Sequence, residues 1–413
     1  MGSESATSRP SEWRGTSAER RFDPVTPVAM LLLALAGVFF IRSAQAYTGG
    51  GLWKMQIIWI TLGAGVYAFV SLVNYKILLE KAHWIYGGSL LLLLLVKTPL
   101  GVEIYGARRW IDLGFFNLQP SEPAKIAVVI MIASVLARSR IGTLRSSLQT
   151  LLKVAVIAVV PMFLIFSQPD LGSTLVFPPL IFSLLYVSKL SDRFFYVSFG
   201  IFVLMLAIVA FDCYRYYQYT YTVEPEVAAV EGRPDYDELS IFPLKDYQRD
   251  RILSFVIPEI VDPRGIGDSW NVNQSRISIG SGGIFGKGWG HGTQALLGYL
   301  PPAVAHNDFI FAVLAEEKGF LGSTVALVLY AVLICNGFRI AGLSRDRFGM
   351  LLAVGVSVLL LVHVFINVGM TMGLTPVTGL PLPFMTYGGS FLLSCCVLQG
   401  LIQSVYRFRK DFS

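Results

Sequence analysis

The sequence is poor in charge, cysteine and histidine. Only 15% of its 413 residues are Asp, Glu, Lys or Arg, against about 25% in an average soluble domain. Its four cysteines and four histidines show neither the spacing of a disulfide framework nor that of a metal site. The sequence therefore predicts neither a disulfide-stapled scaffold nor a His/Cys metal centre, and the cysteines are interpreted as small core residues.

The sequence is instead rich in hydrophobic residues, which make up 54% of the chain, and its mean hydropathy is +0.61. Runs such as "PVAMLLLALAGVFFI" and "YGGSLLLLLLV" approach the roughly 20 residues that a membrane-spanning helix needs. We expect an all-α integral membrane protein with about ten transmembrane helices. The expected spans are 25–45, 53–73, 82–98, 120–138, 148–166, 171–188, 194–212, 308–334, 349–372 and 386–407.

The basic residues of the short connections set the expected orientation. They fall on one side of a ten-span arrangement, which the positive-inside rule assigns to the cytoplasm together with both termini. They are Lys76, Lys81, Arg138, Arg140, Arg145, Lys189, Arg193, Arg339, Arg345 and Arg347. The net charge of +6 is thus mainly a topology signal, and since no basic stripe carries interleaved aromatics, no nucleic-acid partner is expected.

The expected organisation is one membrane domain, residues 24–410, behind a disordered cytoplasmic N-terminal tail, residues 1–23. The domain carries a large extracytoplasmic loop, 213–307, between spans 7 and 8. Loops longer than about 15 residues usually have a function or are disordered. Within this loop, 214–240 is Tyr-rich and then acidic, which indicates a variable insert, whereas 246–306 is Gly-rich with regular apolar residues and should be ordered.

The ordered half of the loop contains "DPRGIGDSWNVNQS", which begins at Asp262. Gly265 and Gly267 allow a tight turn with positive φ, and the polar pair Gln274 and Ser275 follows. A glycine series over 280–292 would let backbone approach a ligand closely, and it encloses Lys287 and His291. The alternative is a flexible Gly-rich loop with scattered polar groups, because Gly-rich runs are weak signals.

Two further groups of polar residues are candidates. The first follows the third span, where Ser121 is a candidate N-cap with Pro123 in the first turn. Its members are Arg108, Arg109 and Trp110 at the outer surface, and Glu122 and Lys125 one helical turn apart. These residues form either a charged rim around a cavity or an ion pair that snorkels to the membrane boundary.

The second group lies within or beside apolar segments. Asp170 and Asp308 open helices, so capping is their simplest role. Glu316 and Glu317 lie about two turns deeper in the eighth span, where ionisable groups are costly and default to functional or pairing roles. The adjacent Lys318 could neutralise one of these glutamates, which leaves a purely structural pair open.

Carboxylates, cations and Gly-rich backbone at one membrane face suit an anionic, lipid-linked substrate. Arginine holds a diphosphate by bidentate hydrogen bonds, and a carboxylate can accept a proton from a sugar hydroxyl that attacks an anomeric carbon.

Five ordered motifs resemble the SEDS family of bacterial membrane proteins, which serves shape, elongation, division and sporulation. They are "GARRWIDLG…QPSEPAKIA", "SQPDLGS", "DYQRDRI…DPRGIGDSWNVNQS…GSGGIFGKGWGHGTQ", "HNDFIFAVLAEEKGFLG" and "GLTPVTGLPLPFMTYGGS". The resemblance covers about residues 25–410. The "YQRDR" and "GHGTQ" versions are more similar to the elongation members of the family than to the division members.

The resemblance implies a peptidoglycan glycosyltransferase of the bacterial cytoplasmic membrane. It would polymerise lipid II, an undecaprenyl diphosphate-linked disaccharide-pentapeptide, at the outer face, with Asp262 as general base for the acceptor 4-hydroxyl. The "WIDLG…QPSE…K" and Lys287 positions would line the cavity and steady the diphosphate. The implied partners are a class B penicillin-binding protein, whose transpeptidase cross-links the glycan, and other membrane proteins of the elongation complex.

No cofactor is evident, and a divalent cation, Mg²⁺ or Mn²⁺, held by carboxylates and the substrate diphosphate is left open. The chain departs from the family pattern at Asp268 and Ser269, which precede Trp270, at Asn307 and at Lys318. Two other function classes also stay open. A lipid II flippase would show charged residues in broken helices as well, and a non-catalytic scaffold for the transpeptidase needs no carboxylate in a Gly-rich turn.

Overall fold

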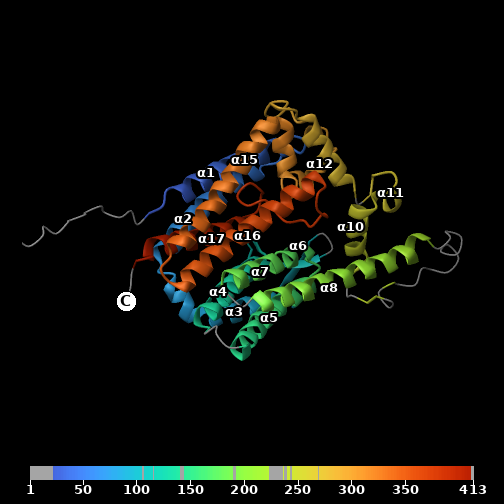
Figure 1. Ribbon diagram of the computed structural model, residues 1–413. Coiled ribbons are helices and arrows are strands. Elements are labelled where there is room, and N and C mark those ends of the chain that lie inside the picture. The colour runs from blue at the N-terminus through green and yellow to red at the C-terminus, as the bar shows by residue number, and fades with distance from the viewer. Residues whose placement is uncertain are drawn as a thin grey trace, which may run out of the picture.

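The computed structural model describes residues 22–104, 107–114, 116–139, 144–188, 192–222, 236, 240–241, 244–267 and 269–410. The helices of the bundle are α1 (Val25–Ala44), α2 (Leu52–Leu72), α3 (Lys76–Leu95), α4 (Ser121–Arg138), α5 (Leu144–Phe166), α6 (Leu171–Leu175), α7 (Phe177–Val187), α8 (Asp192–Tyr217), α15 (Ile310–Leu343), α16 (Arg347–Met372) and α17 (Gly389–Phe408). Figure 1 shows them as a helical bundle. The expectation of an all-α membrane fold is confirmed.

Eight of the described helices are long and apolar enough to cross a membrane. The other two expected spans correspond to α4, which has 18 residues and carries Glu122, Lys125 and Arg138, and to the short pair α6 and α7. Most expected edges lie within a few residues of the observed ones. The third span is the exception among the helix starts, because α3 begins at Lys76, six residues before the expected position.

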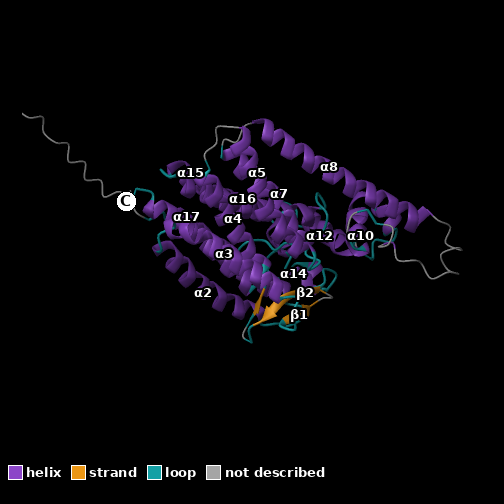
Figure 2. Ribbon diagram, turned by 90° about the horizontal axis from the view of Figure 1, so that it is seen from below, coloured by secondary structure: helices purple, strands orange, loops and turns teal. Residues whose placement is uncertain are grey.

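The connection between α3 and α4 folds into a small antiparallel sheet that the sequence did not predict. Its strands are β1 (Gly101–Ile104), β2 (Ala107–Asp112) and β3 (Asn117–Leu118), in the order β1-β2-β3. Gly101 pairs with Ile111, and Ile111 also pairs with Leu118. Figure 2 shows this sheet at one edge of the bundle, where it presents Arg108 and Arg109.

The helix α16 is the centre of the fold. Its side chains contribute to two apolar clusters, one with α3, α4, α5 and α7 and one with α1, α15 and α17. More than three quarters of its most apolar window is buried, so it reads as apolar around its whole circumference, as expected for a helix surrounded by other helices.

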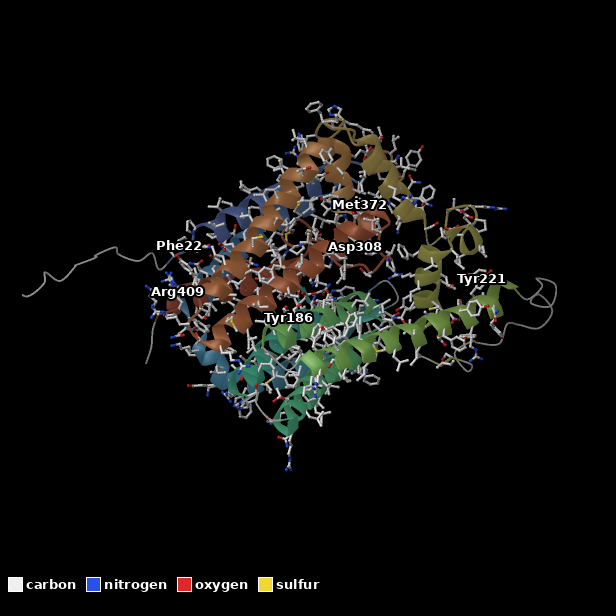
Figure 3. All side chains as sticks on the ribbon, in the orientation of Figure 1. Phe22, Tyr186, Tyr221, Asp308, Met372 and Arg409 are labelled. Atoms are coloured by element: carbon white, nitrogen blue, oxygen red, sulfur yellow. The ribbon has the colours of Figure 1, made fainter. Side chains whose placement is uncertain are left out.

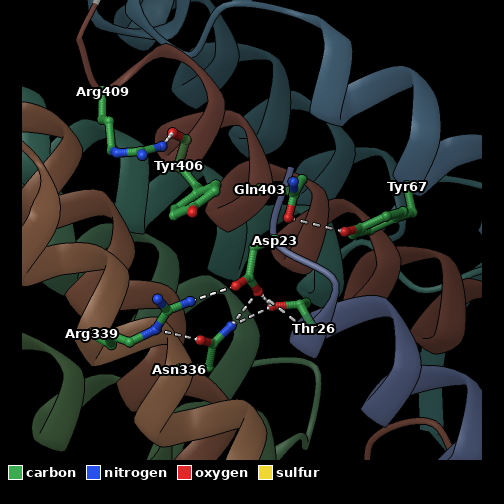
Figure 4. A network of polar contacts seen from close by, with 8 residues as sticks. All are labelled: Asp23, Thr26, Tyr67, Asn336, Arg339, Gln403, Tyr406 and Arg409. Carbon is green, nitrogen blue, oxygen red and sulfur yellow. Dashed lines mark hydrogen bonds and ion pairs between the residues drawn. The ribbon is translucent and has the colours of Figure 1, made fainter. Parts of the chain in front are cut away.

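One end of the bundle gathers both described chain ends and the short connections. Arg347 donates to the carbonyls of Ser139 and Ser188, which follow the last residues of α4 and α7. Asp23 is buried, contrary to its expected place in the tail, and it pairs with Arg339 and accepts from Asn336 (Figure 4). Phe22 and Arg409 accordingly lie at this same end (Figure 3). Residues 1–21 lie outside the described part.

The opposite end carries the long loop, which is largely helical. Its helices are α10 (Asp246–Val256), α11 (Pro258–Val261), α12 (Trp270–Ser281), α13 (Thr293–Leu296) and α14 (Pro302–Ala305). The prediction that 246–306 is ordered is therefore confirmed for the residues described. Most of the insert at 214–240, and Asp268, lie outside the described residues, although α8 and a π-helix (Gln218–Thr222) cover its first part.

α15 is two helices joined at Gly319, whose φ of 63° and ψ of −160° are not helical. An unbroken helix of 34 residues would be about 50 Å long, well beyond the roughly 30 Å of the hydrocarbon layer. The break leaves Phe320 to Leu343 as the spanning part. The preceding turns, which carry Glu316 and Glu317, are wrapped by the loop that follows α12.

Candidate active site

Asp262 directly follows α11, and its carboxylate holds together the tight turn that comes after it. Its Oδ2 accepts from the backbone N–H of Gly267 at 2.9 Å and of Ser269 at 3.2 Å, and from the Ser269 hydroxyl. Its Oδ1 accepts one bond, from the N–H of Ile266 at 3.2 Å. The carboxylate is therefore held from one side, and Oδ1 is the oxygen with more free capacity for a further donor.

The two glycines of this turn are required for different physical reasons. Gly265 has a φ of 64°, as the sequence predicts. Gly267 is not among the positive-φ glycines, so that part of the prediction is wrong. A glycine is favoured at position 267 because there is little space for a side chain: a Cβ there would lie 3.3 Å from the Asp262 carboxyl.

The turn sets the acidity of Asp262. Burial raises its pKa, but the hydrogen bonds from Ser269, Gly267 and Ile266 together outweigh burial, and the pKa lies below the usual range of an aspartate. The carboxylate is therefore ionised at neutral pH. Asp262 is therefore not a base whose pKa is raised toward neutrality.

A small pocket of about 70 Å³ lies next to this turn. Its wall includes Ser269, which holds Asp262, and Asn273, whose amide donates to the Ser269 hydroxyl at 3.3 Å. Arg251 of α10 and Arg276 of α12 bring two positive charges to the same pocket, and Gly373 and Thr375 close it. Ordinary small-molecule sites enclose about 300–1,000 Å³, so a large substrate would lie across the mouth of this pocket.

Arg251 connects the pocket to a second charged group. Asp308 is half-buried and interacts electrostatically with Arg251, Arg109 and Asp170. Arg109 donates to the carbonyls of Gln168 and Pro169, and the Tyr247 hydroxyl donates to Pro169 at 3.1 Å. Burial raises the pKa of Tyr247, against the opposing effect of Arg109 and Arg251. Of the three candidates at this surface, Arg109 belongs to the charged group, while Arg108 is exposed and Trp110 half-buried on β2.

Asp170 has the capping role expected of it, and Ser121 and Asp308 do not. The Asp170 carboxylate accepts from the N–H of Ser173 at 3.0 Å at the start of α6. Ser121 is the first residue of α4, not its N-cap, and its hydroxyl donates to Asp170 at 3.5 Å. Asp308 lies two residues before α15, whose N-cap is Phe309.

Glu122 and Lys125 form the expected ion pair, at 2.7 Å, but not at the membrane boundary. Both are buried, at 4% and 1% exposure, so the interpretation as a snorkelling pair is wrong. The ammonium of Lys125 also lies 3.1 Å from His363 Nε2 and 5.8 Å from the ring centre of Phe391. The pair therefore lies in the bundle interior rather than on a cavity rim.

The Gly-rich loop packs against the protein's own backbone. A Cβ at Gly282 would lie 2.1 Å from the carbonyl of Ala315, and one at Gly286 would lie 2.2 Å from that of Glu317. The N–H groups of Lys287 and Gly288 donate to the carbonyls of Glu316 and Glu317. The close approach that the glycines permit is thus to the broken helix α15.

Side chains also connect this loop to the break in α15, and we call the contact between the two the α15 joint. Lys287 pairs with Glu316 at 2.6 Å, and Thr293 donates to the same carboxylate at 2.9 Å. Glu317 accepts from Ser43 of α1. The cation that neutralises Glu316 is therefore Lys287 and not Lys318. His291 is exposed and contacts the carbonyl of Trp289 at 3.0 Å. Since the twelve residues of α12 span about 18 Å, Lys287 and His291 lie far from the Asp262 turn.

Two other candidates face away from the pocket. Ser275 is buried and donates to the carbonyl of Thr371 at 2.7 Å, and Gln274 is also buried. The sequence reasoning missed Arg251, Asn273, Arg276 and His363. Ser269, Asn273 and Arg276 follow the spacing of one helix face, so a helix assigned at 270–281 would have pointed to them.

Within the described residues, no group of three or more His, Cys, Asp or Glu side chains is arranged to hold a metal ion. A divalent cation held with the substrate diphosphate stays a prediction.

The fold and this site together define a multi-pass membrane protein with a cation-lined pocket beside an ionised carboxylate at the long-loop end. A family profile described as "Cell cycle protein" (FtsW/RodA/SpoVE) matches residues 24–411. The chain therefore belongs to the FtsW/RodA/SpoVE family, and the SEDS resemblance is confirmed.

Named relatives agree with this assignment. The chain is 34% identical to the peptidoglycan glycosyltransferase MrdB of Escherichia coli (strain K12) over 95% of each chain. It is 32% identical to the peptidoglycan glycosyltransferase RodA of Treponema pallidum, over 93% of this chain and 97% of that one. The rod-shape-determining protein RodA of Thermus thermophilus superposes with a TM-score of 0.64 at 26% identity, over 95% of this chain and 98% of that one.

A chain from a structure on the "structural coordination of polymerization and crosslinking by a peptidoglycan synthase complex" superposes with a TM-score of 0.72 at 27% identity. That comparison covers 95% of this chain and 99% of the other.

Proposed function

We propose that this chain is a peptidoglycan glycosyltransferase that polymerises lipid II for cell elongation and shape, with Asp262 as the group that receives the proton of the acceptor hydroxyl. The carrying observation is the Asp262 turn, which fixes an ionised carboxylate beside a pocket with two arginines. Family membership and the named activity of the relatives support the reaction class.

The reaction is a single displacement. The acceptor 4-hydroxyl oxygen attacks the anomeric carbon of the donor, that carbon's bond to the diphosphate breaks with inversion, and the lipid diphosphate leaves with the electron pair. Asp262 Oδ1 has the free capacity to accept the hydroxyl proton. Because its pKa is low, we expect transfer late, when the forming bond has made the hydroxyl acidic. Arg251 and Arg276 supply donors for the developing diphosphate charge.

We propose that both termini and the Arg347 end face the cytoplasm and the long loop faces outward. The clustering of basic short connections at the Arg347 end supports this orientation. A class B penicillin-binding protein is the proposed partner, supported by the similar chain from a peptidoglycan synthase complex. Other membrane proteins of the elongation machinery are expected beside it.

The test is the Asp262→Asn variant, purified and supplied with fluorescent lipid II, with and without the partner. Asn keeps the size of the side chain but accepts no proton, so we expect at least a roughly 100-fold loss of glycan synthesis, with normal folding and partner binding. Glu259→Gln, at an exposed carboxylate of α11, is the matched control and should keep full activity. Synthesis by Asp262→Asn at the wild-type rate would remove the proposed role.

The same variant separates the alternatives. A flippase would move lipid II between leaflets without polymerising it, and a scaffold would stimulate its partner regardless of residue 262. The polar site described above lies at one end of the bundle, which favours an enzyme that works at one face.

A further inference from the structure

A second group of cations lies at the long-loop end of the bundle, outside the proposed active site. Arg42 is in the last turn of α1 and Lys54 is in the first turn of α2, and both are exposed. The whole length of α12 separates the loop that meets them from the Asp262 turn, about 18 Å at the helical rise.

Two tryptophans hold these cations. The Arg42 guanidinium carbon lies 5.2 Å from the ring centre of Trp53 and 5.5 Å from that of Trp289. The Lys54 ammonium lies 5.6 Å from the same Trp53 ring. Trp289 is itself fixed, because its indole N–H donates to the carbonyl of Phe39 at 3.1 Å and its ring meets Phe39 edge-on.

The hydrogen-bond donors of both cations remain available. Across the described residues, no carboxylate or other oxygen pairs with the Arg42 guanidinium or the Lys54 ammonium. The two carboxylates of the neighbouring joint are engaged elsewhere, Glu316 by Lys287 and Glu317 by Ser43. Cation–π contacts position a guanidinium without an acceptor for its N–H groups, so a preorganised pair of cations faces the surface with its donors unused.

The position of Arg42 and Lys54 in the chain indicates which acceptor could pair with their unused donors. The last turn of one spanning helix and the first turn of the next lie at the level of the lipid headgroups, where tryptophan is enriched. Phosphate is the anion present there, and arginine and lysine both bind it, arginine with its planar fork. We propose that Arg42 and Lys54, held by Trp53 and Trp289, bind the phosphate of an anionic phospholipid headgroup.

The site adjoins the α15 joint. Trp289 lies in the loop that fills the break of α15, and Ser43, next to Arg42, donates to Glu317. A bound headgroup would therefore brace α1, α2 and the loop against one another. The proposal is independent of the glycosyltransferase reaction, and its test needs no lipid II polymerisation.

The experiment is native mass spectrometry of the full chain released from nanodiscs of phosphatidylglycerol and phosphatidylcholine. We expect the wild type to retain phosphatidylglycerol preferentially, and Arg42→Gln and Lys54→Gln each to lower that preference at least threefold. Lys97→Gln removes an exposed lysine at the same end, after α3, and should retain it. Trp289→Leu should lower the preference and Trp289→Phe should keep more of it.

Three outcomes would overturn the proposal. The first is wild-type retention by the Arg42→Gln/Lys54→Gln double variant, and the second is an equal loss in Lys97→Gln, which would indicate general charge attraction. The third concerns the source of the phosphate: displacement of phosphatidylglycerol from the wild type by lipid II in the same nanodiscs would assign the cations to the substrate diphosphate. Release of the lipid by millimolar inorganic phosphate would assign them to a free anion. If Arg42→Gln does not fold, Lys54→Gln carries the same test.

Discussion

At the scale of single residues, Asp262 combines two properties that pull against each other. Four hydrogen bonds fix the carboxylate and keep it ionised, yet the same bonds weaken it as a base. In the proposed reaction, such a group is in the right protonation state at neutral pH, and it depends on the transition state to make the hydroxyl acidic. Positioning, rather than a tuned pKa, is then its main contribution.

The lowered pKa makes a pH prediction. The ionised form of Asp262 is present at neutral pH and is lost only as the pH falls through its lowered pKa, so we expect no Asp262-dependent loss of glycan synthesis above about pH 5. Ser269→Ala removes one hydrogen bond to the carboxylate and should move the acidic limb to higher pH. The measurement is the rate of lipid II polymerisation from pH 4 to 9. An acidic limb near pH 7 that Ser269→Ala does not move would point to another residue as the base.

At the scale of elements, α12 shows how a helix sorts its residues by face. Ser269, Asn273 and Arg276 line the pocket, whereas Gln274 and Ser275, adjacent in sequence, are buried against the protein. The motif quoted from the sequence contained all of them except Arg276, but only the helix decides which side chain meets the pocket. The same applies to the glycines beyond it, which meet the break in α15.

The α15 joint predicts a structural role for Lys287. Lys287→Met leaves Glu316 with Thr293 and the N–H of Gln294 as donors, so we expect the free energy of unfolding to fall by about 1–3 kcal/mol, with little change in KM for lipid II. Thermal unfolding in detergent and polymerisation kinetics measure the two quantities. Lys318→Met, at the exposed neighbour, is the control. A raised KM with unchanged unfolding would return Lys287 to the substrate site.

At the scale of the whole molecule, polar residues at the interior of an apolar bundle tie distant segments together. Lys125 of α4 meets Glu122 on its own helix and His363 of α16, the central helix. Gln119 and Ser121 at the start of α4 donate to Asp170, which caps α6. These contacts fix how α4, α6 and α16 sit together beneath the charged group that reaches Arg251.

The buried pair predicts a non-additive effect. Lys125→Met leaves the Glu122 carboxylate without its partner, and breaking a buried pair costs about 3–5 kcal/mol of stability. The double variant Glu122→Gln/Lys125→Met removes both charges and should recover most of that loss. A double-mutant cycle on thermal unfolding measures the coupling. Additive losses would mean that the two side chains do not stabilise each other.

The sequence by itself determined the membrane class, the positions of nearly all the spans and the long loop, and it offered Asp262 as the candidate base. These follow from local properties: the length of the apolar runs, the basic connections, and a turn whose hydrogen-bond donors lie within seven residues of Asp262. The tertiary structure alone decided that Glu122 and Lys125 are buried beside His363, that Lys287 serves Glu316, and that Arg251 shares a pocket with Arg276. Each of these depends on which face of a helix meets which neighbour, and that is set by the packing of segments far apart in the chain.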